Sequence, residues 1–196
     1  STLTAAILKA WDPRTVLAGN MGVSAVAYLA QIEPETPVVL EISNWQLEAM
    51  DERQVGPSIA VLTNIHEDHL DTYDGFDDYA NTKRSIARHL SPDDTFIVNR
   101  DNAEAWRAVD ETRSRVVSFG AGRPAGDGFW VEDRTICWEI HDSRGCIELP
   151  DRFVYQGMHQ RLNAAAAIAA ALLRGADEAS IRSGIDAYEG VKDRAE

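Results

Sequence analysis

The sequence predicts an α/β fold, in which helices flank a mostly parallel sheet and a small antiparallel meander is added. Short apolar runs alternate with helical patterns over the first 120 residues, and this alternation is typical of βαβ units. Beyond Gly120 three short strand patterns follow one another with turn residues between them, as in a meander. Two of the apolar runs end in polar clusters, at the position where open α/β sheets bind ligands.

Periodicity and turn residues place the individual elements. A helix over residues 2–11 ends at the Asp12-Pro13 turn, and Gly175 ends a helix that runs from residue 157 through an alanine run. Further helices are expected over residues 23–32, 44–52, 76–90, 103–112 and 178–188. Strands are expected over residues 15–18, 37–41, 59–62, 95–98 and 115–119, and the meander strands over residues 129–132, 136–140 and 146–149.

Composition narrows the classes of protein. The 196 residues fit one domain, with an antiparallel β subregion over residues 126–155. The net charge of −13 argues against nucleic-acid binding, and no apolar run is long enough to insert into a membrane. Cys137 and Cys146 form no Cys-x-x-Cys pair, so we expect neither a disulfide framework nor a zinc knuckle, and a reducing cytoplasm is the simplest setting. The chain enters a helical pattern at Ser1 without a methionine, which suggests a piece of a longer protein.

A cluster of two imidazoles and three carboxylates follows the apolar run at residues 59–62. His66 and His69 lie three residues apart, which in a helical turn would place them on one face, and acidic residues occupy positions 67, 68 and 71. The spacing differs from the His-Glu-x-x-His motif of zinc proteases. The cluster therefore indicates either a metal site or a polar rim with structural histidines.

Glu41 follows a second apolar run, which we expect to be a buried strand. A carboxylate there is costly to bury unless a metal ion or an ion-pair partner accompanies it. Because parallel strands end at the same edge of a sheet, we expect Glu41 and His69 to meet there if their strands are close together.

Five further polar residues have a structural and a functional interpretation. Asn20 could contact a ligand or belong to a plain turn. Ser43 and Gln46 could bind a substrate or form a helix capping box. Lys83 lies on an amphipathic helix, where a solvated lysine is the simpler interpretation. Asn163 lies in the alanine-rich helix, where a buried amide needs a partner.

Six segments taken together resemble the Mur ligases, which are ATP-dependent amide-forming enzymes of peptidoglycan synthesis. They occur in the family's order and extend over nearly the whole chain. The block at residues 41–47 favours the branch that adds D-glutamate. The segments are Gly19-Asn20-Met21-Gly22, Glu41-Ile42-Ser43-Asn44-Trp45-Gln46-Leu47, Asn64-Ile65-His66-Glu67-Asp68-His69-Leu70-Asp71, Tyr79-x-x-x-Lys83, Gly157-x-His159-x-x-x-Asn163-x-x-Ala166 and Gly190-Val191-x-x-Arg194-x-Glu196.

The resemblance implies that residues 1–196 are the central ATP-binding domain, with a sheet like that of P-loop NTPases. Ser1-Thr2 would be the end of a Gly-Lys-Ser-Thr P-loop whose glycines and lysine are absent here, as are the N-terminal UDP-binding and C-terminal domains. P-loop amides and the lysine hold the phosphates. The 196-residue chain alone should therefore bind ATP poorly and be inactive.

The resemblance also implies a set of site residues. Ser1 and Glu41 would hold one Mg²⁺, while His69 and Lys83 would hold a second. Lys83 would be carbamylated, because an ammonium has no lone pair for a metal whereas a carbamate presents oxygens. The substrate-side residues would be Asn20, Ser43 and Gln46, and the nucleotide-side residues Ser1, Thr2, Asn163 and Arg194.

The implied enzyme is a cytoplasmic, monomeric, ADP-forming ligase that acts on UDP-N-acetylmuramoyl-L-alanine and D-glutamate. It would phosphorylate the substrate carboxylate, and the amine of D-glutamate would then attack the acyl phosphate. One alternative is a sister Mur ligase that adds another amino acid. A zinc metallohydrolase using Glu41, His66, His69 and Asp71 is a second alternative, and an inactive relative kept as an interaction module is a third.

Overall fold

The computed structural model describes residues 1–20, 23–67, 72–141, 143–155 and 157–190. The helices are α1 (Thr2–Trp11), α2 (Asn44–Glu52), α3 (Phe76–Arg84), α4 (Ala103–Trp106), α5 (Asp151–Tyr155), α6 (Met158–Arg174) and α7 (Glu178–Ala187). The 3₁₀ helices are η1 (Ala25–Gln31), η2 (Ser85–Ala87) and η3 (Arg107–Glu111). The strands are β1 (Val16–Gly19), β2 (Val38–Glu41), β3 (Ile59–Leu62), β4 (Thr95–Asn99), β5 (Arg115–Gly120), β6 (Gly128–Glu132), β7 (Thr135–Ile140) and β8 (Ser143–Glu148).

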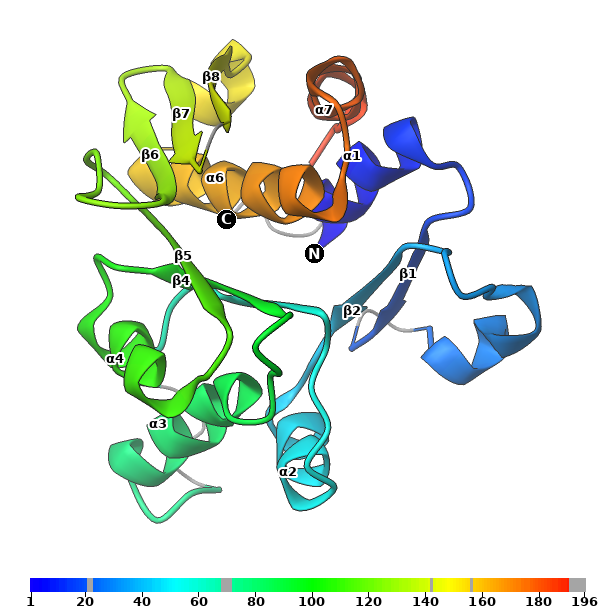
Figure 1. Ribbon diagram of the computed structural model, residues 1–196, viewed down its shortest axis with the longest axis vertical. Coiled ribbons are helices and arrows are strands. Elements are labelled where there is room, and N and C mark those ends of the chain that lie inside the picture. Colours follow the sequence, from blue (N-terminus) through cyan, green and yellow to red (C-terminus); the bar gives the residue numbers. More distant parts are fainter. Residues whose placement is uncertain (21–22, 68–71, 142, 156, 191–196) are drawn as a thin grey trace.

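The main sheet lies between two layers of helices. Helices α1, α6 and α7 lie over one face and α3 and α4 over the other (Figure 1). Alternate residues of β4 point to opposite faces. Phe96 and Val98 join the core under α3 and α4, whereas Ile97 joins the core under α1 and α6. A strand buried on both faces is what a continuous apolar run predicts, so β4 folds as expected.

The main sheet has the order β3-β4-β5-β6-β7-β8. Its first four strands are parallel, and β6, β7 and β8 pair antiparallel. The meander therefore continues the parallel sheet, because β6 pairs with β5 as well as with β7. The predicted fold class, a mostly parallel sheet with flanking helices and a small antiparallel meander, is confirmed.

Strands β1 and β2 form a separate, two-stranded parallel sheet. Val38 and Leu40 are 38% and 45% exposed, so the expectation of a buried strand before Glu41 is wrong. Only Val39, between them, packs against the main core. The two strands that carry the polar clusters, β2 and β3, thus belong to different sheets in the described part of the chain.

The meander corrects the expectation about cysteine. Cys137 of β7 and Cys146 of β8 are direct cross-strand partners with Cα atoms 4.1 Å apart, and they form a disulfide. A nine-residue separation gave no indication of this pairing, because the pairing depends on the position of the turn between the two strands.

Most predicted helices occur, but three of them differ from the prediction. Residues 25–31 form a 3₁₀ helix, and the helices predicted over 76–90 and 103–112 end in the 3₁₀ turns η2 and η3. None of the residues of η1 is buried, so no apolar face stabilises an α-helix there. Helix α5 was not anticipated. The alanine run of α6 is buried, as expected.

Hydropathy adds one observation about the helices. No helix in the described ranges has the length and apolar character that crossing a bilayer requires.

Candidate functional site

The N-terminus of α1 and the end of β2 meet at one point. The Ser1 hydroxyl donates a hydrogen bond of 2.5 Å to Oε2 of Glu41. Ser1 is exposed and Glu41 is half-buried, so both remain within reach of a ligand. Helix α1 is ten residues long, and the partial positive charge at its N-terminus favours anions.

Backbone contacts join the ends of β1 and β2. Gly19 lies opposite Glu41 in the strand register, and the Asn20 N–H donates to the Glu41 carbonyl at 2.8 Å. Gly19 has φ +99°, and a Cβ built there would lie 2.2 Å from the Glu41 carbonyl oxygen. Only glycine fits this position. The Gly-Asn pair therefore fixes the backbone beside Glu41 and leaves the Asn20 side chain exposed.

Ser43 and Gln46 form the capping box of α2. The Gln46 N–H donates to the Ser43 hydroxyl at 3.4 Å, and the Ser43 N–H donates to the Gln46 side-chain oxygen at 2.8 Å. The structural interpretation of this pair is thus confirmed. Gln46 is also exposed and lines the adjacent cleft.

A cleft of about 640 Å³ opens beside the two-stranded sheet. Polar groups from the ends of β1 and from α2 meet apolar side chains in its wall. The sequence did not predict the apolar wall of this cleft, because the apolar run at residues 38–40 was interpreted as a strand buried on both faces. An exposed strand face is usually recognised by alternating polar residues, and this run has none. The lining residues are Gly19, Asn20, Ser24, Ala25, Val26, Leu40, Ile42 and Gln46.

Two asparagines hold the segment that follows β3. Asn99 donates from its side-chain nitrogen to Oδ1 of Asn64 at 2.9 Å. Asn102 caps α4, accepts from the Ile65 N–H and donates to the Ile65 carbonyl, both at 3.3 Å. Neither asparagine was identified from the sequence, although an asparagine just before a helix is a common cap signal.

The imidazole and carboxylate cluster is only partly described. His66 and Glu67 are exposed at the end of the segment held by these asparagines. His69, Asp68 and Asp71 lie outside the described residues. Within the described ranges, no group of three or more His, Cys, Asp or Glu side chains has an arrangement that could hold a metal ion. The predicted meeting of Glu41 and His69 is therefore not tested.

Tyr73 connects this region to α2. Its hydroxyl donates to Oε1 of Glu48 at 2.7 Å. Burial, followed by this hydrogen bond to a carboxylate, raises the pKa of Tyr73 above its usual value. The phenol therefore stays protonated and keeps its role as donor.

Lys83 lies in the last turn of α3, one helical turn after Tyr79. Its Nζ is 5.7 Å from the centre of the Tyr79 ring, a cation–π geometry. Lys83 is half-buried. The Tyr-x-x-x-Lys spacing thus has a structural consequence, because residues four apart face each other on a helix.

The remaining predicted residues lie in three different places. The Thr2 hydroxyl is 3.0 Å from the hydroxyl of Tyr188, which follows α7. Asn163 is exposed on α6, so the premise that its amide is buried is wrong: it lies just before the buried alanine run. Arg194 lies outside the described residues.

This arrangement provides hard oxygen donors next to a helix N-terminus. A hydroxyl and a carboxylate, 2.5 Å apart, are the ligand types that Mg²⁺ takes in proteins. The N–H groups at the start of α1 suit phosphate. The geometry is therefore suited to binding a metal–phosphate group beside an open, partly apolar cleft.

Comparison with known proteins gives a consistent family. Residues 2–171 match the Mur ligase middle domain. The chain is 33% identical over 198 residues to a UDP-N-acetylmuramoylalanine–D-glutamate ligase of Symbiobacterium thermophilum, and 35% identical over 205 residues to the ligase of that name from Roseiflexus sp.. These alignments cover 100% and 99% of this chain but 43% of each relative, so the chain spans less than half the length of the relatives it matches.

Solved structures agree at the level of the fold. MurF from Acinetobacter baumannii superposes with a TM-score of 0.71 at 23% identity, over 100% of this chain and 45% of that one. A pseudomurein peptide ligase type C from Methanothermus fervidus gives a TM-score of 0.68 at 17% identity, over 100% and 48%. With the family match and the relatives at 33% and 35% identity, the chain belongs to the Mur ligase middle-domain family.

Proposed function

We propose that this chain, residues 1–196, is the central ATP-binding domain of a ligase that adds D-glutamate to UDP-N-acetylmuramoyl-L-alanine. Two of the relatives, at 33% and 35% identity, carry that activity in their names. The enzyme would be a cytoplasmic monomer. Its P-loop glycines and lysine, its UDP-binding domain and its C-terminal domain would lie in parts of the protein outside these 196 residues.

The observation that carries the proposal is the 2.5 Å hydrogen bond between Ser1 and Glu41 at the N-terminus of α1. The two side chains fit a Mg²⁺ ion, because both offer oxygen atoms and Glu41 brings the negative charge. When bound, the ion would neutralise charge between the phosphates of ATP and an anionic substrate. Ser1 and Thr2 would contact the phosphate side of the nucleotide.

A second Mg²⁺ would be held by His69 and by a carbamylated Lys83. The ammonium of Lys83 cannot ligate a metal, so carbamylation by bicarbonate or CO₂ would have to supply the oxygens. Lys83 is half-buried on α3, with its Nζ 5.7 Å from the centre of the Tyr79 ring, and the carbamate would form by attack of its neutral amine on CO₂ with loss of one proton.

Substrate and nucleotide would approach from different sides. Asn20 and Gln46 line the cleft beside β2 and Ser43 is hydrogen-bonded to Gln46, and these three residues would face UDP-N-acetylmuramoyl-L-alanine. The capping box would hold Ser43 and Gln46 rigid, so little side-chain entropy would be lost on binding. Asn163 and Arg194 would contact the nucleotide.

The reaction would proceed in two steps. The substrate carboxylate attacks the γ-phosphorus of ATP, and ADP leaves with the bonding electron pair. The amine of D-glutamate then attacks the acyl carbon, inorganic phosphate leaves, and the amide nitrogen loses a proton. Ser1, Glu41 and Lys83 would act by positioning and by charge compensation, the main contributions to phosphoryl transfer.

The test uses the full-length ligase that contains this chain. Phosphate release from ATP is followed with UDP-N-acetylmuramoyl-L-alanine and D-glutamate, for wild type, Lys83→Ala and Lys9→Ala. We expect release to need all three substrates and to fall by at least about 100-fold in Lys83→Ala. Lys9 is exposed on α1, so its variant should keep the wild-type rate. Depleting bicarbonate should lower the wild-type rate and leave Lys83→Ala unchanged.

Other outcomes distinguish the alternatives. Phosphate release that does not depend on D-glutamate would indicate a sister ligase with another amino-acid substrate. Full activity in Lys83→Ala would exclude the carbamate. Tightly held zinc with no response to ATP and Mg²⁺ would favour the metallohydrolase, and binding of neither would favour an inactive module.

A further inference from the structure

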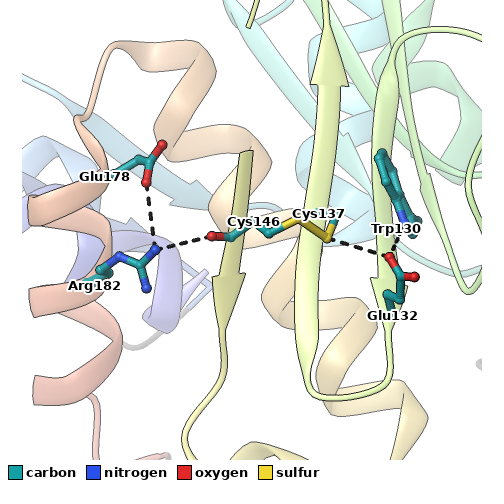
Figure 2. The surroundings of a disulfide bond; sticks show 6 residues. All are labelled: Trp130, Glu132, Cys137, Cys146, Glu178 and Arg182. Atoms are coloured by element: carbon teal, nitrogen blue, oxygen red, sulfur yellow. Dashed lines mark hydrogen bonds and ion pairs between the residues drawn. A yellow bond between two sulfur atoms is a disulfide. The ribbon is translucent and has the colours of Figure 1, made fainter. Parts of the chain in front are cut away.

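The pair Cys137 and Cys146 lies on a hairpin that is held together without it. Strands β7 and β8 are antiparallel neighbours, with pairing from Thr135–Glu148 to Ile140–Ser143. The ladder places the two cysteines opposite each other, with Cα atoms 4.1 Å apart (Figure 2). The two sulfur atoms therefore remain adjacent whether oxidised or reduced, and the bond can open and close without rearrangement of the backbone.

The two cysteines differ in their access to solvent. Cys137 is 3% exposed, whereas Cys146 is exposed. Strand β8 is the last in the order of the main sheet, so its outer edge is not covered by another strand of that sheet. Thiol–disulfide exchange needs an approach to the attacked sulfur. A small thiol therefore reaches the bond from the side of Cys146.

The charges around the pair are also asymmetric. Oε2 of Glu132 lies 3.9 Å from Sγ of Cys137, and the Trp130 indole N–H donates to the same oxygen at 3.4 Å (Figure 2). On the other side, the Arg182 guanidinium donates to the backbone carbonyl of Cys146 at 3.2 Å and also pairs with Glu178 at 3.7 Å, so its charge is partly balanced (Figure 2). A nearby carboxylate disfavours a thiolate and a nearby cation favours it. Because Glu132 lies beside Cys137 and Cys146 is the more exposed of the two, Cys146 is the better nucleophile and Cys137 the poorer leaving group.

We propose that Cys137 and Cys146 are a thiol–disulfide exchange site for small thiols of the glutathione class, with Cys146 as the reacting sulfur and Cys137 as its buried partner. This role is independent of the ligase activity proposed above. It rests on the proposed cytoplasmic setting, because disulfides of intracellular proteins are usually transient or regulatory, and a cross-strand pair with one exposed cysteine on an edge strand fits that class.

Reduction at this site takes two exchange steps. A thiolate attacks Sγ of Cys146, the disulfide breaks, and its electron pair leaves on Sγ of Cys137, which takes a proton. A second thiolate then attacks the sulfur of the bound small thiol and releases Cys146 with formation of the small-molecule disulfide. Two small thiols are oxidised and one protein disulfide is reduced. Glu132 retards the first step because it lies beside the departing charge.

The first test maps the reacting sulfur with oxidised glutathione as the probe. Reduced Cys137→Ser and Cys146→Ser variants are incubated with it, and adducts are counted by intact-mass spectrometry. We expect Cys137→Ser to gain one glutathione at least about tenfold faster than Cys146→Ser does. The reduced wild type should lose two hydrogens and keep no adduct. Equal rates in the two variants, or a stable adduct on the wild type, would overturn the assignment.

The second test leaves both cysteines in place, so it does not depend on the folding of the serine variants. The rate of disulfide reduction by glutathione is compared in wild type, Glu132→Gln and Glu148→Gln. We expect a several-fold faster reduction in Glu132→Gln. Glu148 lies on β8 and pairs with Arg134 at 3.3 Å, so its variant loses the same charge and should behave as wild type. An unchanged rate in Glu132→Gln, or equal acceleration in both variants, would contradict the proposed role of Glu132.

Discussion

The two sheets of this chain are held in place by different means. The six-stranded half, β3–β8 with its helices, contains the large buried aromatic side chains, including Phe129 at 0% and Trp138 at 2% exposure. In the two-stranded half, β1, η1 and β2, Val26 is 72% and Leu29 is 63% exposed, and η1 has no buried residue. The first half is stabilised mainly by packing of large side chains, whereas the second has the small buried residues Val16 and Ala18, Val39 against the main core, and short backbone contacts around Glu41.

This difference shows how one domain can combine a closely packed core with an exposed candidate site. The proposed metal ligands lie at the junction, Ser1 at the N-cap of α1 and Glu41 at the end of β2. Helix α1 packs into the main core through Ile7 and Leu8, so Ser1 is anchored by the six-stranded half. Glu41 is positioned by the close approach of Gly19 instead. A closely packed core is destabilised when the shape of a buried side chain changes. The contact between Gly19 and the Glu41 backbone leaves no room for even one added carbon atom.

The largest expected effect comes from truncating one apolar side chain in each half. Phe129 is buried and stacks on Trp138 with ring centres 6.1 Å apart, so Phe129→Ala should lower the free energy of unfolding by about 3–5 kcal/mol. Leu40 is 45% exposed, so Leu40→Ala should cost less than about 1 kcal/mol. Urea unfolding followed by circular dichroism measures both. Similar losses in the two variants would mean that the halves are equally packed.

An intermediate effect is expected where the two-stranded half depends on backbone contact. Gly19→Ala places a methyl group against the Glu41 carbonyl at φ +99°, and we expect a loss of about 2–3 kcal/mol. Hydrogen exchange should place the loss at β1 and β2. Gly122→Ala serves as the matched control, because a Cβ there meets nothing within 4 Å. Protection in β1 and β2 that survives the Gly19 substitution would contradict this account.

The smallest expected effect is electrostatic and belongs to the six-stranded half. Partial burial raises the pKa of Asp127, but hydrogen bonds from the His141 N–H, the Arg115 guanidinium and the His141 ring outweigh it and lower the pKa to about 2. Because the folded pKa is below the unfolded value near 3.8, Asp127 stabilises the fold above about pH 4 and loses this effect as the pH falls towards 2.

Asp127→Asn should therefore lower the free energy of unfolding by about 1–2 kcal/mol at pH 7. The difference in this free energy between the variant and wild type should shrink between pH 4 and pH 2. Urea unfolding at pH 7, 4 and 3 measures it. Asp93→Asn, which changes an exposed turn carboxyl, is the control for the loss of one charge. A difference that stays constant over this pH range would mean that Asp127 acts through packing.

Local sequence features predicted much of this fold. The Asp12-Pro13 turn and Gly175 ended helices where the structure ends them. The serine and glutamine of α2 form the expected capping box. These predictions succeeded because each depends on interactions within a few residues. The helix expected over residues 23–32 is a 3₁₀ helix. An α-helix there would need its apolar residues to pack against a distant part of the chain, and none of the residues of η1 is buried.

The site was predictable in its residue types but not in its contacts. Glu41 was identified as the carboxylate at a strand end, but only the family resemblance, and no local pattern, placed it beside Ser1, whose hydroxyl donates to it from forty positions away. Asn99 and Asn102, which hold the segment after β3, gave no signal beyond a helix cap. The cysteine pair was missed because its register depends on the turn between β7 and β8.

The sequence by itself determined most of the order of strands and helices, the capping box of α2, the family resemblance and the polar residues at strand ends. The elements and the capping box follow from periodicity and turn chemistry, which act over one or two helical turns, whereas the family resemblance rests on six short motifs taken together along the chain. The tertiary structure decided that β1 and β2 form their own sheet, that Leu40 and Asn163 are exposed, and that Cys137 meets Cys146. These features depend on which distant segments exclude water from each other, and no local pattern specifies that.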